Sequence, residues 1–116
     1  MTTEIYSHVQ LPEKIEIGSY SVIGQPFKGM CKHSATTLIG EGAVIRSHAV
    51  IYAGNRIGKN FQTGHHVFVR ELNVIGDDVS IGTLSVVEHH VEIGNGVRIH
   101  TQVFIPEFSI LEDDSW

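Results

Sequence analysis

The chain has 116 residues, with 8 lysines and arginines against 13 aspartates and glutamates, and its formal net charge is -5. This length suits one small domain, and the negative charge argues against a protein that binds nucleic acid. With 41% apolar and 18% charged residues, the composition also argues against disorder. No apolar run reaches the roughly 18 to 20 residues that span a bilayer, so no membrane span is expected.

The N-terminal segment and the cysteine content indicate an intracellular protein. Residues 1–14 hold no basic stretch followed by an apolar one, so no secretory signal is expected. Cys31 is the single cysteine and has no partner for an intramolecular disulfide, which fits a reducing compartment. We therefore expect the protein to be cytoplasmic.

A six-residue repeat organises the chain. In the N-terminal block, residues 5–28, four hexads begin at aliphatic residues. These are Ile5, Leu11, Ile17 and Ile23. Residues 29–38 then break the phase, as one irregular hexad with an inserted four-residue loop would do. From residue 39 the repeat runs through thirteen continuous hexads, residues 39–116, and we treat residues 1–116 as one domain.

Each hexad of the second block follows the same internal pattern. The first position is aliphatic in twelve of thirteen hexads, the second is glycine six times, and the fifth is small or mid-sized in all but one. Positions five, six and one therefore read inward, outward, inward, as a short strand does. Positions two to four carry Gly, Asn and Asp, which tolerate left-handed backbone angles and make corners.

A second period, of eighteen residues, lies above the first. A Gly-acidic or Gly-Asn corner recurs in every third hexad, at residues 40–42, 58–60, 76–78 and 94–96. Three hexads per coil predict a three-sided coil in which residues eighteen apart stack, among them Asn55 and Asn73. The sequence thus predicts an all-β fold, a parallel β-solenoid of about six 18-residue coils.

The pattern aliphatic-Gly-x-x-small-x, over residues 5–28 and 39–116, resembles the hexapeptide-repeat acyltransferases. This resemblance implies a left-handed parallel β-helix that assembles as a homotrimer. Members of that family continue for several further coils, which hold much of the acetyl-CoA site, so the C-terminal coils are expected to be missing here.

Two stretches carry a narrower resemblance. Residues 57–71 and 86–94 are similar to bacterial sugar acetyltransferases, which transfer acetyl groups from acetyl-CoA to nucleotide-linked amino sugars in surface polysaccharide synthesis. The resemblance therefore implies acetyl-CoA as the donor and a sugar as the acceptor. It leaves open which sugar is used, which acyl group moves and whether the product is an amide or an ester.

The same resemblance implies a catalytic base. Family members with an acidic-His step at a coil corner use that histidine as the base, and the matching residue here is His89. A neutral imidazole can accept the proton that an attacking amine loses, and Glu88 or another carboxylate would orient the ring. Further residues expected to bind or orient the substrate are His90, His65, His66 and Arg70. The alternative for Arg70 is a salt bridge to Glu88 one coil above.

The stacking also predicts a subunit interface. Four outward positions eighteen apart are all apolar, namely Val50, Phe68, Val86 and Phe104. A continuous outward apolar row marks an association surface and suits a cyclic trimer, in which His89 would border the subunit boundary. The alternative is that residues 29–38 cover this row.

Two other functions stay open. One is a non-catalytic trimeric β-helix used for assembly or sugar binding, which the missing coils favour. The other is suggested by hexapeptide-repeat carbonic anhydrases, which hold zinc with histidines that include a pair five residues apart. No two of the 8 histidines here have that spacing, so no metal is expected.

Overall fold

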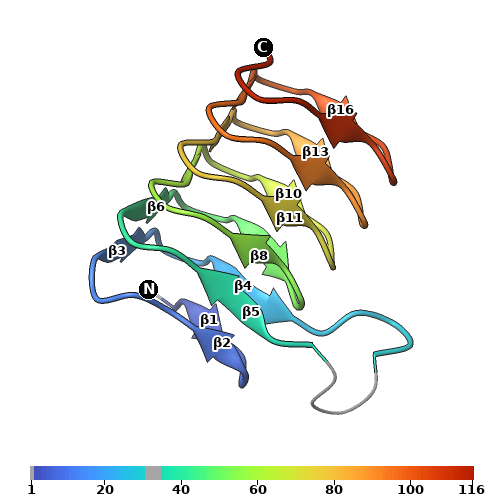
Figure 1. Ribbon diagram of the computed structural model, residues 1–116. Helices are drawn as coiled ribbons and strands as arrows, with labels where there is room; N and C mark the ends of the chain where they lie inside the picture. The colour runs from blue at the N-terminus through green and yellow to red at the C-terminus, as the bar shows by residue number, and fades with distance from the viewer. Residues whose placement is uncertain (1, 31–34) are drawn as a thin grey trace.

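The computed structural model describes residues 2–30 and 35–116 and is a three-sided parallel β-helix (Figure 1). Its strands form three parallel sheets, which we call sheets A, B and C. Among the described residues, no helix is long and apolar enough to cross a membrane.

Each sheet takes one strand from every coil that it crosses. Sheet A consists of β1 (Glu4–Ile5), β4 (Val22–Gln25), β7 (Val50–Tyr52), β10 (Phe68–Val69), β13 (Val86–Val87) and β16 (Phe104–Ile105). Sheet B consists of β2 (Val9–Gln10), β5 (Thr37–Ile39), β8 (Arg56–Ile57), β11 (Val74–Ile75), β14 (Glu92–Ile93) and β17 (Ile110–Leu111). Sheet C consists of β3 (Ile15–Ile17), β6 (Ala43–Ile45), β9 (Gln62–Thr63), β12 (Ser80–Ile81) and β15 (Arg98–Ile99).

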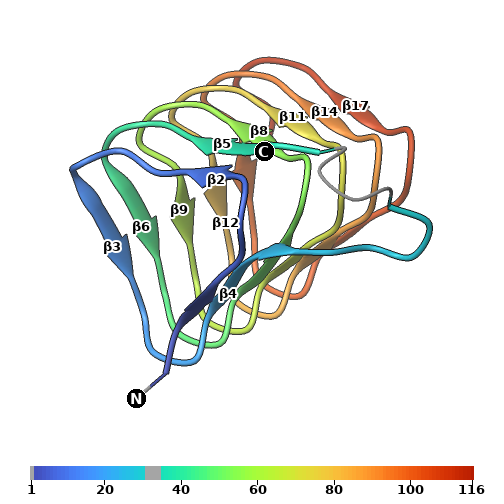
Figure 2. The same ribbon diagram turned by 90° about the horizontal axis from the view of Figure 1, so that it is seen from below.

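The chain winds in the left-handed sense. Figure 2 shows the molecule from its N-terminal end. In this view the chain passes counter-clockwise from β2 to β3 to β4 and back to β5 while it moves away from the viewer. Residues eighteen apart are partners in the sheets, as Phe68 is with both Val50 and Val86. The predicted β-helix of about six coils, with its 18-residue stacking, is confirmed.

Inward residues at positions five and one of the hexads fill the prism. In β6 the exposure alternates between buried and half-buried as the strand pattern predicts. Phe61, the one large residue at position five, is fully buried, and Val79 and Ile81 are buried beside it in the cluster that runs through the core. The buried side chains form one continuous hydrophobic core along the stack of coils. Burying each such side chain contributes about 1.5 to 3 kcal/mol to stability.

The corners that join the sheets depend on the fourth position of the hexad. All thirteen hexads from residue 39 onward have a positive φ there, 56° at His90 for example, although ten of these residues are not glycine. The second-position glycines have another reason. A Cβ at Gly58 would lie 2.8 Å from the carbonyl of Gly76 in the next coil. From residue 39 onward the expected left-handed angles therefore fall at position four, and glycine at position two permits close approach of the backbones.

The break in the repeat lies between β4 and β5. Glu4 pairs with Val22 eighteen residues on, whereas Val22 pairs with Val50 twenty-eight residues on, so this coil holds ten extra residues. The insertion falls between a strand of sheet A and the next strand of sheet B (Figure 1). The irregular segment ends before residue 38, because β5 already begins at Thr37. Cys31 and most of the expected four-residue loop lie outside the described residues.

An asparagine ladder holds the corner between sheets A and B from inside. The Oδ1 of Asn55 accepts a hydrogen bond from the backbone N–H of Asn73 at 3.1 Å, and the Oδ1 of Asn73 accepts from the N–H of Val91 at 2.7 Å. The side-chain amides of both asparagines donate to the carbonyl of Arg70, at 2.6 and 3.0 Å. Both side chains are buried, so the predicted asparagine stack is also the support for the outer turn.

Substitution of Asn73 by alanine is expected to destabilise the protein by about 1 to 3 kcal/mol, because the buried N–H of Val91 loses its acceptor. Asn95→Ala is the matched control. Its Oδ1 also accepts a backbone N–H, that of Asp77, but at an exposed corner where water can replace it, so its effect should stay within about 0.5 kcal/mol. Urea unfolding followed by circular dichroism measures both values, and equal losses would contradict a special role for the ladder.

Candidate functional site

The candidate site lies at the corner between sheets A and B, which we call the A–B corner. Four successive coils contribute residues 52–54, 70–72, 88–90 and 106–108 to it. None of the four has glycine at the second position of the hexad; these positions carry Tyr52, Arg70, Glu88 and Pro106. Side chains therefore occupy this position throughout the corner, whereas six of the other nine hexads from residue 39 onward have glycine there.

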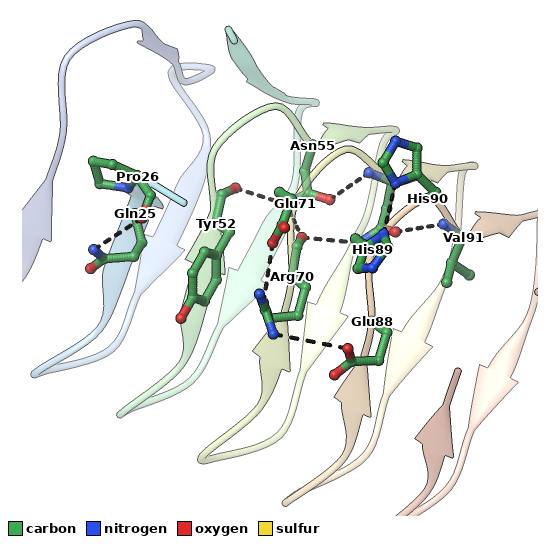
Figure 3. Close-up of polar contacts among 11 residues, drawn as sticks. Gln25, Pro26, Tyr52, Asn55, Arg70, Glu71, Glu88, His89, His90 and Val91 are labelled. Carbon is green, nitrogen blue, oxygen red and sulfur yellow. Dashed lines mark hydrogen bonds and ion pairs between the residues drawn. The ribbon is translucent and has the colours of Figure 1, made fainter. Parts of the chain in front are cut away.

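Arg70 is the centre of a charged network at the A–B corner (Figure 3). Its Nε lies 3.1 Å from Oε1 of Glu71, and its guanidinium reaches Oε1 of Glu88 at 3.9 Å. The same guanidinium lies over the ring of Tyr52, 4.9 Å from the centroid. The salt bridge to Glu88 that the sequence predicts is present, and Arg70 pairs with both carboxylates.

His89 and His90 directly follow Glu88 in the chain and form a contacting pair. Their Nδ1 atoms lie 2.7 Å apart, and Figure 3 shows the two rings meeting at the end of the corner. His90 stacks on Phe108 of the next coil at 5.2 Å, and His89 meets the same ring edge-on at 5.6 Å. His89 is half-buried and His90 is exposed. The nitrogen that His89 contacts thus belongs to His90, while Glu88 faces Arg70.

His65 and His66 occupy a different corner, between sheets C and A. The Nδ1 of His65 lies 2.8 Å from Oγ of Ser47, and His66 stacks on His48 with ring centroids 4.6 Å apart. The predicted stack of His48 and His66 is therefore confirmed. Sheet A lies between this corner and the A–B corner, so within one chain these histidines do not meet His89.

An outward apolar row runs along sheet A between the two histidine corners. Phe68 and Phe104 are 44% and 60% exposed, and the strand register places the row in a line. Val22 extends it by one coil, because it pairs with Val50. The described part of residues 29–38 leaves both phenylalanines open to solvent.

Two residues of the site were not singled out in the sequence, Phe108 and Ser47. Each lies eighteen residues from a candidate histidine, Phe108 from His90 and Ser47 from His65. The 18-residue period is the signal in the sequence that identifies both residues as neighbours of these histidines. It fixes which residues are neighbours, although the orientation of the rings follows only from the structure.

Several hollows in the described part of the surface lie away from the candidate histidines. Open hollows beside Glu13 and Gly42, and beside Val74 and Glu112, have linings that do not include His89 or His90. Within residues 2–30 and 35–116, no group of three His, Cys, Asp or Glu side chains lies close enough to hold a metal ion.

Comparisons with known proteins bear on the repeat and the fold. Residues 74–107 match the family model of the bacterial transferase hexapeptide (six repeats), a segment that includes Glu88, His89 and His90. The crystal structure of a hexapeptide transferase family protein from Anaplasma phagocytophilum superposes with a TM-score of 0.60 at 16% identity, over 96% of this chain and 70% of that one. The hexapeptide repeat and the β-helix fold are thereby confirmed.

A second solved structure is the UDP-N-acetylglucosamine acyltransferase of Francisella novicida. It gives a TM-score of 0.36 at 20% identity, and the alignment covers 95% of this chain and 54% of that one. This chain thus spans about half the length of that enzyme. Among curated protein sequences there is no match.

Proposed function

We propose that this hexapeptide-repeat β-helix is an acyltransferase that moves an acetyl group from acetyl-CoA to a nucleotide-linked amino sugar in surface polysaccharide synthesis. The observation that carries the proposal is the position of His89. It lies half-buried at the A–B corner, inside the segment that matches the transferase repeat. The choice of donor and acceptor rests on the similarity of residues 57–71 and 86–94 to sugar acetyltransferases. With this donor and acceptor, the proposed location is the cytoplasm.

The proposed assembly is a homotrimer built on sheet A. The exposed apolar row, from Val50 to Phe104, would be removed from water when three copies bring this sheet toward a common axis. In a cyclic arrangement the two edges of the sheet meet different neighbours. His65 and His66 of one subunit would then line the same cleft as His89 of the next, although they are separated within the chain.

His89 acts as the general base in the proposed reaction. The acceptor amine or hydroxyl attacks the thioester carbonyl carbon, and Nε2 of His89 takes the proton that the acceptor loses. The tetrahedral intermediate collapses with cleavage of the C–S bond, and the departing CoA thiolate receives the proton from His89. The products are the acetylated sugar and free CoA thiol, with no net change at the histidine.

Replacement of Phe68 by glutamate is expected to give monomers, because it places a charge in the centre of the apolar row. Val74→Glu is the matched control, since Val74 is 52% exposed at the same hexad position on sheet B. Sedimentation equilibrium should show three chains for the wild type and for Val74→Glu, and one chain for Phe68→Glu. A trimer mass for Phe68→Glu would place the interface elsewhere.

Replacement of His89 by alanine is expected to lower kcat at least about 100-fold, the usual contribution of a positioned general base. The release of free thiol from acetyl-CoA, measured with a panel of nucleotide-linked amino sugars, gives the rate. Circular dichroism and sedimentation of the variant establish that the fold and the assembly persist. Full activity of a folded His89→Ala protein would remove this residue from the mechanism.

Acetyl-CoA is expected to bind the 116-residue protein in isothermal titration calorimetry. This measurement separates the enzyme from the alternative of a non-catalytic trimeric module, because a module used for assembly or sugar binding needs no acyl donor. Desulfo-CoA of the same charge serves as the control for recognition of the nucleotide portion. A flat titration at millimolar acetyl-CoA would favour the non-catalytic module.

A further inference from the structure

The contact between His89 and His90 restricts where their protons lie. Two Nδ1 atoms 2.7 Å apart form a hydrogen bond only when one carries a hydrogen and the other presents a lone pair. In the neutral pair, the ring that donates through Nδ1 has a free lone pair at Nε2. The ring that accepts at Nδ1 carries its hydrogen on Nε2. The pair therefore offers one basic nitrogen and one N–H to the outside.

We propose that His90 is the positioning residue for His89, accepting the Nδ1–H of His89 and so leaving Nε2 of His89 free to act as the base. This inference rests on the proposed acyl transfer, in which Nε2 of His89 takes the acceptor's proton. His90 does not touch the reacting atoms. It fixes the tautomer and the ring orientation of the residue that does, the role that a carboxylate has in many histidine sites.

The surroundings of His90 hold its ring in place. Its backbone has a φ of 56°, which sets the direction in which the side chain leaves the corner. The ring lies almost parallel to Phe108, with an interplanar angle of 21°. The neighbouring N–H of Val91 is bound by Asn73, and the N–H of His90 itself donates to the carbonyl of Glu71 at 3.3 Å. Turning His90 away from His89 would break the stack on Phe108.

The carboxylates of the A–B corner do not pair with His89, so His90 is its hydrogen-bond partner. Glu88 and Glu71 both pair with Arg70, one on each side of its guanidinium. Glu107, the acidic residue of the next coil, is exposed. When Nε2 of His89 takes up the acceptor's proton, the positive ring still donates through Nδ1 to His90, and this charge-assisted bond stabilises the protonated base.

The chain supplies a matched set of variants. Leu72 and Phe108 occupy the same hexad position as His90 in the adjacent coils, with φ of 61° and 64°, so leucine fits this corner. His90→Leu removes the acceptor atom with the fold intact. His90→Asn keeps an acceptor near the position of Nδ1, and asparagine tolerates the positive φ. Gln102→Leu is the control for the backbone. It also places leucine at a positive φ, 57°, but on the corner between sheets C and A.

The kinetic result expected is a loss of kcat of about 10- to 100-fold in His90→Leu, by analogy with the range seen when the hydrogen-bond partner of a metal-ligating histidine is removed. KM should stay unchanged, because His90 does not bind the substrate in this role. His90→Asn should restore most of the rate, and Gln102→Leu should match the wild type. Wild-type kcat in His90→Leu would overturn the proposal, and so would a loss that His90→Asn fails to restore.

A measurement independent of activity separates this inference from the proposed function. Two-bond ¹H–¹⁵N correlation spectra of ¹⁵N-histidine protein report which ring nitrogen carries the hydrogen. His89 is expected as the Nδ1–H tautomer and His90 as the Nε2–H tautomer, and His90→Leu should convert His89 to Nε2–H. Absence of transfer by the wild type together with these spectra would refute the acyl transfer and retain the pair. Nε2–H tautomers for both rings would refute the pairing even in an active protein.

Discussion

The fold depends on one constraint, the alignment of residues eighteen apart. Each coil is bonded to its neighbours through the main chain, as the N–H of Val74 is to the carbonyl of Val91, and it buries its aliphatic side chains only against those neighbours. A change of length inside a coil would turn inward residues outward. The ten extra residues therefore fall between β4 and β5, at a corner and not within a strand, and the 18-residue register resumes beyond them.

The same constraint decides where chemistry can be placed. Positions one and five of each hexad are taken by the core and position six by the outer rows, so positions two to four carry the side chains of the candidate site. At six of the thirteen hexads from residue 39 onward, glycine at position two permits close backbone approach, as at Gly58. The A–B corner has side chains there instead, and the buried ladder of Asn55 and Asn73 holds its backbone. Scaffold and candidate site therefore share one corner.

Much of this was predictable from periodicity, because stacking in a β-helix is a matter of counting. The three sheets, the apolar row on sheet A, the asparagine ladder and the contact of Arg70 with Glu88 all follow from spacings of six and eighteen. The reason for the glycines did not follow, since it depends on how closely coils approach. Nor did the partner of His89. Sequence places Glu88 beside it, but the orientation of each side chain is set by Arg70 below and Phe108 above.

The pairing of His89 with an imidazole is consistent with the charges already present. One cation, Arg70, faces two carboxylates at this corner, so the network is already negative. A third carboxylate directed at His89 would add to that repulsion, whereas a neutral ring accepts a hydrogen bond without it. Among the four coils of the A–B corner, only the one at residues 88–90 has ring nitrogens at both its third and fourth positions. A single step along the chain therefore supplies both the proposed base and its partner.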